Sequence, residues 1–344
     1  MWSGHNNASR KASKKRCKAK KQQETREQLL KRTLNPSDTT HFVNWRRVKY
    51  EELDLYPTIP VDRHKKPTRP PTPEEIKSAY DQVETFHLFK TGRNIVQDPL
   101  DKESIIAFID FIKFEDMSEQ DKADLNLFTT FLHRSKKFIS PVAVDSRSWG
   151  GLMWVIGWRK SSDGDQIVGR YIKKFETEDM EEFDKHFIES HKIADILAYH
   201  FKQMANTPFE ENQDLMKKHN IPSFSALEFH DEKTESDCSP HLVFTTDHFY
   251  NAPHSDKEDI SQFAFVMFIP TLSSDGSLAL DPSSYDISSG PFVFPDHKFG
   301  INFDHQHGIV KMIWQANRYK HCTMPSTNGG PLRYTTLNGP LTLA

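Results

Sequence analysis

The chain has 344 residues and a formal net charge of −3, from 45 Lys and Arg against 48 Asp and Glu. This average hides two opposites, because residues 1–34 carry a net charge of +9 and the rest of the chain carries −12. A basic segment joined to an acidic body indicates a nucleic-acid partner or nuclear import.

The composition excludes several classes of protein. Aromatic residues make up 12% of the chain, enough to bury a core, so most of it is not disordered. The longest apolar runs, such as residues 151–158, are less than half of a membrane span, and no apolar signal region follows Met1. Three cysteines cannot form a disulfide framework or a four-cysteine zinc site. We therefore expect a soluble intracellular protein with no membrane partner.

Residues 1–34 form the first predicted unit, a disordered basic tail. Residues 10–21 hold eight Lys and Arg and almost no apolar side chain that a core could bury. Runs of this density are typical of nuclear-localisation signals or of arms that contact phosphate, and a solvated tail without a role is the alternative. We expect a nuclear protein with this cluster as its localisation signal.

Residues 35–72 follow as a proline-rich connector that we expect to be extended and irregular. The connector ends at a helix start. Thr72 can cap the helix, Pro73 suits the first helical position, and Glu75 completes a capping box.

The remaining chain divides into a helical extension over 73–140 and a strand-rich domain over 141–344. Apolar spacing predicts helices in the extension at 73–86, 101–113 and 118–137. In the second domain it predicts one long helix at 178–204 and a surface insertion at 270–290. Strands are predicted at 151–159, 167–173, 224–229, 241–246, 263–269, 291–294, 309–314, 320–324 and 332–337.

Many short strands with turn signals between them predict a jelly roll. The fold class is thus α+β, with a double-stranded β-helix (jelly-roll) core, flanking helices and the disordered basic tail.

A His-x-Asp pair carries the first chemical signal. His254 and Asp256 follow the strand predicted at 241–246 and a turn at 251–253. Residues i and i+2 of an extended segment point to the same side, so an imidazole and a carboxylate can share one metal. Alone the pattern is weak, because a surface loop with two polar side chains is the commoner explanation of it.

The third ligand decides between these interpretations. Two His and one carboxylate leave positions open on Fe(II), the arrangement of non-haem oxygenases. Downstream candidates are His297, His305, His307 and His321.

In a 2-oxoglutarate enzyme the distal His is followed by a basic residue on the next strand. His321 fits, since a turn at 328–331 and a return strand bring Arg333 beside it. Arg333 offers a planar fork for a carboxylate, and Thr335 on the same face adds a hydroxyl. The pair His307 and Arg318 is rejected because an extended strand without a turn separates them.

The sequence resembles the Tet-like Fe(II)/2-oxoglutarate oxygenases of fungi, relatives of the TET/JBP nucleic-acid oxygenases. The resemblance covers about residues 141–344. It is carried by these segments: residues 149–160 (Trp-Gly-Gly-Leu-Met-Trp-Val-Ile-Gly-Trp-Arg-Lys), 251–256 (Asn-Ala-Pro-His-Ser-Asp), 292–295 (Phe-Val-Phe-Pro), 307–314 (His-Gly-Ile-Val-Lys-Met-Ile-Trp), His321 and Arg333.

The resemblance implies a double-stranded β-helix with His254, Asp256 and His321 on Fe(II), and Arg333 and Thr335 on 2-oxoglutarate. It also implies O2 as second cosubstrate and methylated DNA as partner. In that family the reaction oxidises the methyl group of 5-methylcytosine to hydroxymethyl, formyl and carboxyl forms, with N6-methyladenine as a further candidate substrate. Succinate and CO2 are released.

A stacked base cannot reach such a metal, so the target must be flipped into the pocket. We expect aromatic and polar residues just before the metal ligands to receive the flipped base, and a basic strand end to meet phosphate. The residues are Asp247, Phe249, Tyr250, Asn251 and Arg159. Two alternatives stay open: the same chemistry on RNA or protein, and a catalytically inactive jelly-roll binding module.

Overall fold

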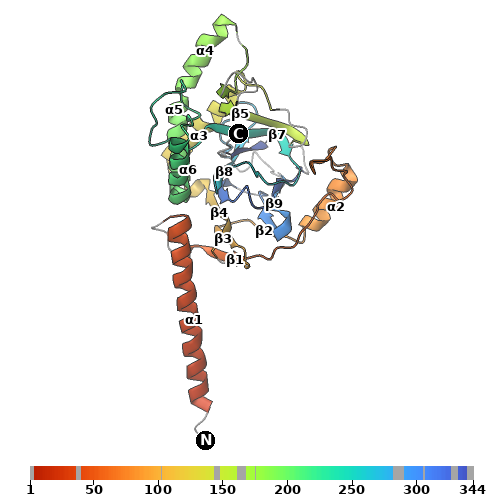
Figure 1. The fold of residues 1–344 in the computed structure, drawn as a ribbon, viewed down its shortest axis with the longest axis vertical. Helices are drawn as coiled ribbons and strands as arrows, with labels where there is room; N and C mark the ends of the chain where they lie inside the picture. The colour runs from red at the N-terminus through yellow and green to blue at the C-terminus, as the bar shows by residue number, and fades with distance from the viewer. Residues whose placement is uncertain are drawn as a thin grey trace.

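Two facing β-sheets and a layer of helices make up the body of the protein in this computed structural model (Figure 1). The structure describes residues 4–35, 40–101, 103–142, 148–160, 168–174, 176–281, 290–304, 307–326 and 332–338. The helices are α1 (Gly4–Thr33), α2 (Pro73–Val83), α3 (Glu119–Ser135), α4 (Thr177–Ile188), α5 (Ser190–Met204) and α6 (Asn206–Lys218). Short 3₁₀ turns lie at Thr40–Phe42, Phe114–Asp116 and Pro295–His297.

The strands belong to a large and a small sheet. In spatial order the large sheet holds β1 (Asn44–Arg47), β3 (Arg93–Gln97), β4 (Ile105–Lys113), β11 (Gly308–Trp314), β8 (Ala264–Leu272), β13 (Leu332–Asn338), β7 (His241–Tyr250), β5 (Gly150–Lys160) and β6 (Val168–Arg170). The small sheet holds β12 (Cys322–Thr323), β9 (Phe292–Phe294), β10 (Phe299–Ile301) and β2 (His87–Phe89).

The large sheet is buried on both faces. One face packs against α3, α5 and α6, with Phe128, Phe201 and Phe265 in that cluster. The other face packs against the small sheet, where Phe268 and Phe294 share a second cluster. Layers of helix, large sheet and small sheet give a mixed α+β fold, as predicted. Its jelly-roll topology stays a prediction.

The predicted capping box of α2 and the helix predicted at 118–137 are both confirmed. Thr72 caps α2, since its hydroxyl accepts from the Glu75 backbone N–H at 3.3 Å and the Glu75 carboxylate accepts from the Thr72 N–H at 2.8 Å. Pro73 occupies the first turn of α2, and the helix predicted at 118–137 is α3. Capping needs only neighbouring residues, so it can be read from a short segment.

The helix predicted at 101–113 is wrong, because this segment contains strand β4. Residues 105–109 are completely buried and contribute to both clusters that flank the large sheet. A strand covered on both faces has a continuous apolar run, which periodicity alone cannot tell from a buried helix. Four Ile and two Phe in β4 were the signal for a strand. The segment predicted as a helical extension therefore contributes strands to both sheets.

Two further predictions in the second domain need correction. The helix predicted at 178–204 is two helices, α4 and α5, which meet at Glu189, and the following helix α6 was not predicted. No strand forms at 224–229, a described segment of turns in which the Asp231 carboxylate accepts from the Leu227 and Glu228 N–H groups. A short apolar run with Ser between its members was mistaken for strand alternation.

The predicted disordered tail is not confirmed, because residues of this segment form helix α1. The end of α1 is held by the body: Leu29 and Leu30 of its last turns, and Leu34 just beyond the helix, lie in the cluster between the helices and the large sheet. Asn35, just after the helix, donates to the carbonyls of Gln203 and Met204 at the end of α5. Tertiary packing of this end compensates for the low apolar content of the rest.

Among the described residues, no helix has the length and apolar character that a membrane crossing requires.

We predict that Leu30→Ala lowers the free energy of unfolding by about 2–5 kcal/mol, because Leu30 is fully buried where α1 meets the body. Leu100→Ala is the matched control: Leu100 is 85% exposed, so we expect a change within about 0.5 kcal/mol. Chemical denaturation of the full chain measures both. Equal effects would contradict the docking of α1.

Candidate metal centre

The predicted ligands His254 and His321 are joined by an antiparallel bridge. The His254 N–H donates to the His321 carbonyl at 3.0 Å, and the His321 N–H donates to the His254 carbonyl at 2.9 Å. Three residues before His254, Asn251 makes the next rung, with its N–H on the Thr323 carbonyl and its Oδ1 accepting from the Thr323 N–H at 2.8 Å. The backbone thereby sets two imidazoles side by side, with ring centroids 4.7 Å apart.

Asp256 completes the cluster from a different anchor. Its N–H donates to the carbonyl of Ala316, just beyond the end of β11, at 2.9 Å. Its two carboxylate oxygens lie 3.7 Å from His254 Nε2 and 3.5 Å from His321 Nε2. One ligand atom from each of the three residues lies within 4.8 Å of the others. The structure thus brings the three predicted ligands together.

Both imidazoles are oriented in the same way. His254 Nδ1 lies 2.8 Å from the Ala252 carbonyl, and His321 Nδ1 lies 2.9 Å from the Tyr319 carbonyl. A carbonyl can only accept, so each Nδ1 carries the proton and each Nε2 lone pair faces Asp256. Partners of this kind orient metal-binding His residues and fix their tautomer. Sequence reasoning missed them, although both lie two residues before a candidate ligand.

One side of the cluster is buried in the protein and the other side is exposed to solvent. The His321 ring is stacked against Phe292 of β9 at 5.6 Å and meets Trp314 of β11 edge-on at 5.4 Å. The His321 side chain is only 3% exposed, against 27% for His254 and 19% for Asp256. His321 is therefore inserted between the two sheets, while the other two ligands reach solvent.

The donor set fits an iron(II) ion. In a facial set, donor atoms about 2.1 Å from one ion lie about 3.0 Å apart, and the separations of 3.7 and 3.5 Å between Asp256 and the two imidazoles approach this value. Two imidazoles and one carboxylate form the facial triad of non-haem iron oxygenases. The neighbouring Cys322 is not part of this donor cluster: its thiol is fully buried in a separate apolar cluster, where burial raises its pKa.

The paired glycines of the Trp-Gly-Gly segment are required by the residues that precede the ligands. A Cβ on Gly150 would lie 2.2 Å from the Tyr250 ring, and one on Gly151 would lie 2.4 Å from the Phe249 backbone. Gly151 also has a φ of +69°, which favours glycine. These glycines therefore allow β5 to pass directly beneath Phe249 and Tyr250.

Strand β7 bulges where it approaches the metal ligands. Residues 247–249 stand opposite the single residue Gly151, and Asp247 and His248 both have positive φ. The Thr246 hydroxyl donates to the Asp247 carboxylate at 2.7 Å and accepts from the Trp154 indole at 3.0 Å. Bulges and strained backbone of this kind are concentrated next to active sites.

Three other predicted substrate residues, Tyr250, Asn251 and Arg159, lie in three different surroundings. Tyr250 packs edge-on against Trp149, and burial raises the pKa of Tyr250, so its hydroxyl stays a neutral donor. Asn251 has its side-chain oxygen occupied by Thr323, which makes it part of the bridge. Arg159 is at the opposite end of β5, about 30 Å along the strand from Gly150, and lies over the Tyr171 ring. The structure does not bring Arg159 to the triad.

Arg333 and Thr335 lie on β13, in the middle of the large sheet. The backbone register places Arg333 opposite Thr271 and Thr335 opposite Ile269. The turn expected at 328–331 is outside the described residues, as are the side chains of Arg333 and Thr335. Their contact with 2-oxoglutarate stays a prediction.

Of the other candidate histidines, the structure describes His297 and His307, and neither is part of the metal cluster. His297 is buried in a 3₁₀ turn between the rings of Tyr50 and Tyr319. His307 precedes β11, and Arg318 forms an ion pair with Asp101 at 3.1 Å. His305 is outside the described residues.

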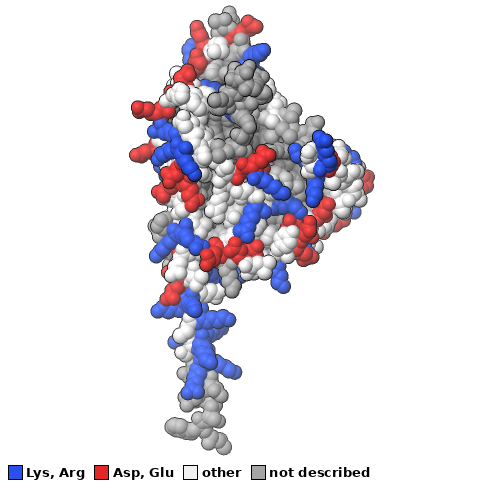
Figure 2. All heavy atoms as spheres, in the orientation of Figure 1, with Lys and Arg blue, Asp and Glu red and all other residues white. Residues whose placement is uncertain are grey.

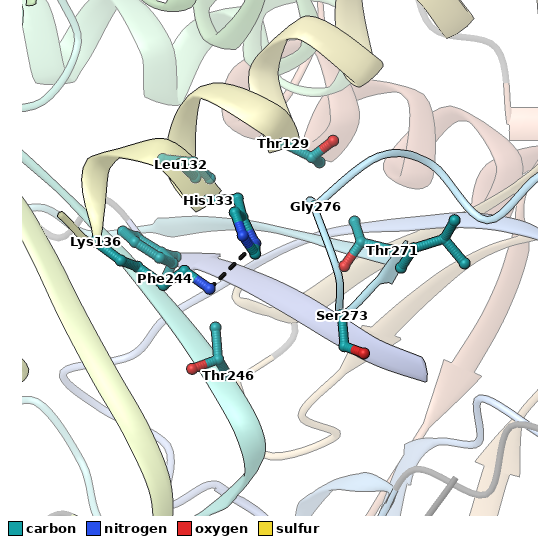
Figure 3. A pocket seen from close by; sticks show the side chains of 10 residues that line it. Thr129, Leu132, His133, Lys136, Phe244, Thr246, Thr271, Ser273 and Gly276 are labelled. Carbon is teal, nitrogen blue, oxygen red and sulfur yellow. Dashed lines mark hydrogen bonds between the residues drawn. The ribbon is translucent and has the colours of Figure 1, made fainter. Parts of the chain in front are cut away.

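A cavity between α3 and the ends of β7 and β8 is distinct from the metal centre (Figure 3). On the wall that α3 provides, Lys136 donates to His133 at 3.1 Å. Its volume is about 20 Å³, enough for one water molecule and far too small for a nucleobase. The lining residues are Thr129, Leu132, His133, Lys136, Phe244, Thr246, Thr271, Leu272, Ser273 and Gly276.

Comparison with known proteins gives the family. Residues 118–326 match the Tet-like 2OG-Fe(II) oxygenase superfamily, which is more than half of the chain. The chain belongs to this superfamily, as its resemblance predicted, and it uses Fe(II), 2-oxoglutarate and O2. The match contains the triad and ends before Arg333.

One solved structure, described as "The structure of OsALKBH1", is similar over 69% of this chain and 96% of that chain, with 12% sequence identity and a TM-score of 0.29. A likeness this weak supports no inference. No curated protein matches the sequence.

We predict that His254→Ala and Asp256→Ala each abolish tight metal binding, because each removes one of three donors. The loss should exceed the roughly 10–100-fold that removal of an outer-shell partner costs. Calorimetric titration with Mn(II) as an oxygen-stable substitute measures it. The control is His248→Ala, an exposed histidine six residues before His254. Unchanged affinity in either ligand variant would mean that the triad is misassigned.

Proposed function

We propose that the protein is a DNA dioxygenase that oxidises the methyl group of a modified base. 5-Methylcytosine is the proposed substrate, converted to hydroxymethyl, formyl and carboxyl forms, and N6-methyladenine is a further candidate. The proposal rests on one observation above all: the preoriented cluster of His254, Asp256 and His321 in a chain of the Tet-like superfamily.

In this proposal the chain supplies ligands and orientation. His254, Asp256 and His321 hold the iron, while the carbonyls of Ala252 and Tyr319 hold the imidazoles in the tautomer that presents Nε2. When bound, iron and 2-oxoglutarate supply the oxidising power that hydroxylates a methyl group with release of succinate and CO2.

Beside the metal, the proposal gives Arg333 and Thr335 to the cosubstrate. The Arg333 guanidinium binds the far carboxylate of 2-oxoglutarate as a planar fork, and Thr335 adds a hydroxyl to the same carboxylate. Both residues lie on β13, next to β8 and β7 in the large sheet.

A duplex base must leave the stack to reach the iron, and we assign its reception to the bulge of β7. Phe249 and Tyr250 supply the aromatic surface, and Tyr250 also offers a neutral hydroxyl. Asp247, steadied by Thr246, can accept a hydrogen bond from an exocyclic amino group, which cytosine and adenine both carry. Asn251 acts through the bridge instead, as a positioning residue.

We also propose a nuclear location, on the basis of the basic cluster at residues 10–21. Imaging of the tagged full chain tests it, and exclusion from the nucleus would contradict it. The alternatives are the same chemistry on RNA or protein, or an inactive binding module. A complete facial triad with oriented imidazoles disfavours the inactive module.

We predict that the iron-loaded protein converts 5-methylcytosine in duplex DNA and releases succinate in proportion. Mass spectrometry of nucleosides after incubation measures the products, with N6-methyladenine DNA and methylated RNA of the same sequence run in parallel. His321→Ala is the inactive control, because it removes a ligand. Turnover on RNA alone would transfer the proposal to RNA, and turnover on none of these substrates would overturn it.

We predict that Arg333→Ala raises the 2-oxoglutarate concentration for half-maximal rate by roughly 10–100-fold, because a charged hydrogen-bonding partner of the carboxylate is lost. The affinity for Mn(II) should not change. Arg318→Ala is the matched control, since that guanidinium is paired with Asp101. If Arg318→Ala and not Arg333→Ala raised the requirement, the cosubstrate residue would be misassigned.

A further inference from the structure

Helix α1 leaves the body as a free-standing arm. Its last turn is buried through Leu29 and Leu30, and Arg26 lies over the Trp45 ring at 5.2 Å. Every residue from 10 to 22 is exposed, and the helix projects away from both sheets (Figure 1). At 1.5 Å per residue, Arg10 lies about 29 Å from the buried Leu29.

The basic residues of this arm are arranged by face. At 100° per residue, six of them fall within a sector about 140° wide, which we call the basic stripe. The stripe consists of Arg10, Lys11, Lys14, Lys15, Lys18 and Lys21. Arg16 and Lys20 lie on the opposite face. Among the described residues, none of these eight cationic groups has an ion pair, and blue side chains crowd the exposed arm in Figure 2.

The composition of the arm identifies the kind of partner. Ala12, Cys17 and Ala19 are the least polar residues between 10 and 22, and they form no continuous apolar face. A helix that binds a membrane surface or pairs with a second helix needs such a face. What the stripe offers is dense positive charge on a rod that is 10–12 Å across, and the DNA major groove is about 12 Å wide.

We propose that the basic stripe of α1 binds the phosphate backbone of a nucleic acid outside the catalytic pocket. The body carries a net charge of −12, so the arm supplies the attraction for a polyanion that the body lacks. The binding is independent of base sequence. Its choice of partner rests on the proposed function, in which the substrate base belongs to a nucleic acid.

Two double variants with the same charge change and the same spacing test the stripe. Lys14→Gln/Lys18→Gln removes two charges from it, whereas Arg16→Gln/Lys20→Gln removes two from the opposite face. Gln is nearly as good a helix former as Lys or Arg, so α1 should persist, and circular dichroism checks this. Binding of the full-length chain to an unmethylated 30-base-pair duplex is measured at several salt concentrations.

For six phosphate contacts, affinity falls about 10³-fold between 50 and 200 mM salt, and for four contacts about 10²-fold. For Lys14→Gln/Lys18→Gln we expect the shallower salt dependence, a loss of about 10²-fold over this range. For Arg16→Gln/Lys20→Gln we expect nearly the salt dependence of the wild type. Equal losses of affinity in the two variants would mean that binding does not depend on the basic stripe in particular. Unchanged binding in both variants would overturn the proposal that α1 binds nucleic acid. If binding were unchanged but the variants no longer accumulated in the nucleus, the helix would instead be assigned to an import receptor.

The assay separates this inference from the proposed function, because binding to unmethylated DNA needs neither iron nor turnover. Oxidation of a free methylated nucleoside should be equal in wild type and both variants, since a nucleoside has no flanking backbone. A protein that binds duplex through the stripe but oxidises no base would sustain this inference and overturn the proposed function. Normal oxidation of methylated DNA, together with equal duplex binding by wild type and both variants, would sustain the proposed function and overturn this inference.

Discussion

The two backbone hydrogen bonds between His254 and His321 are the constraint on which the metal centre depends. They join a loop that leaves the large sheet to the start of a strand of the small sheet, so each sheet brings one imidazole. Asn251 extends the same ladder, and Asp256 is tied separately to the end of β11. Side-chain positions set by the main chain keep their geometry without help from the ion, which is how a preorganised site is built.

The ligands could be predicted from the sequence because their chemistry is local. A His and an Asp two residues apart share one side of an extended chain, and His321 precedes a turn that is visible in the residue types. The capping box of Thr72 and Glu75 is local in the same way. The role of Asn251 could not be predicted, because its partner Thr323 is 72 residues away and only the assembled fold brings them together.

The errors have one physical origin, the effect of tertiary surroundings on segments that are ambiguous alone. Strand β4 is apolar on both faces because it lies between helices and the small sheet, and no periodicity records that burial. Helix α1 was predicted as a disordered tail for the opposite reason. Few of its residues are apolar, and the few that matter, Leu29 and Leu30, are sufficient to dock one end.

The unequal exposure of the three ligands divides the coordination sphere into two regions. His321 is enclosed by Phe292 and Trp314, whereas His254 and Asp256 border solvent. We therefore expect ions, water and cosubstrate to enter and leave past His254 and Asp256, while His321 stays at the buried end of the site. Exchange of the metal should then proceed from this solvent-exposed side, leaving the backbone bridge and the packing between the sheets undisturbed.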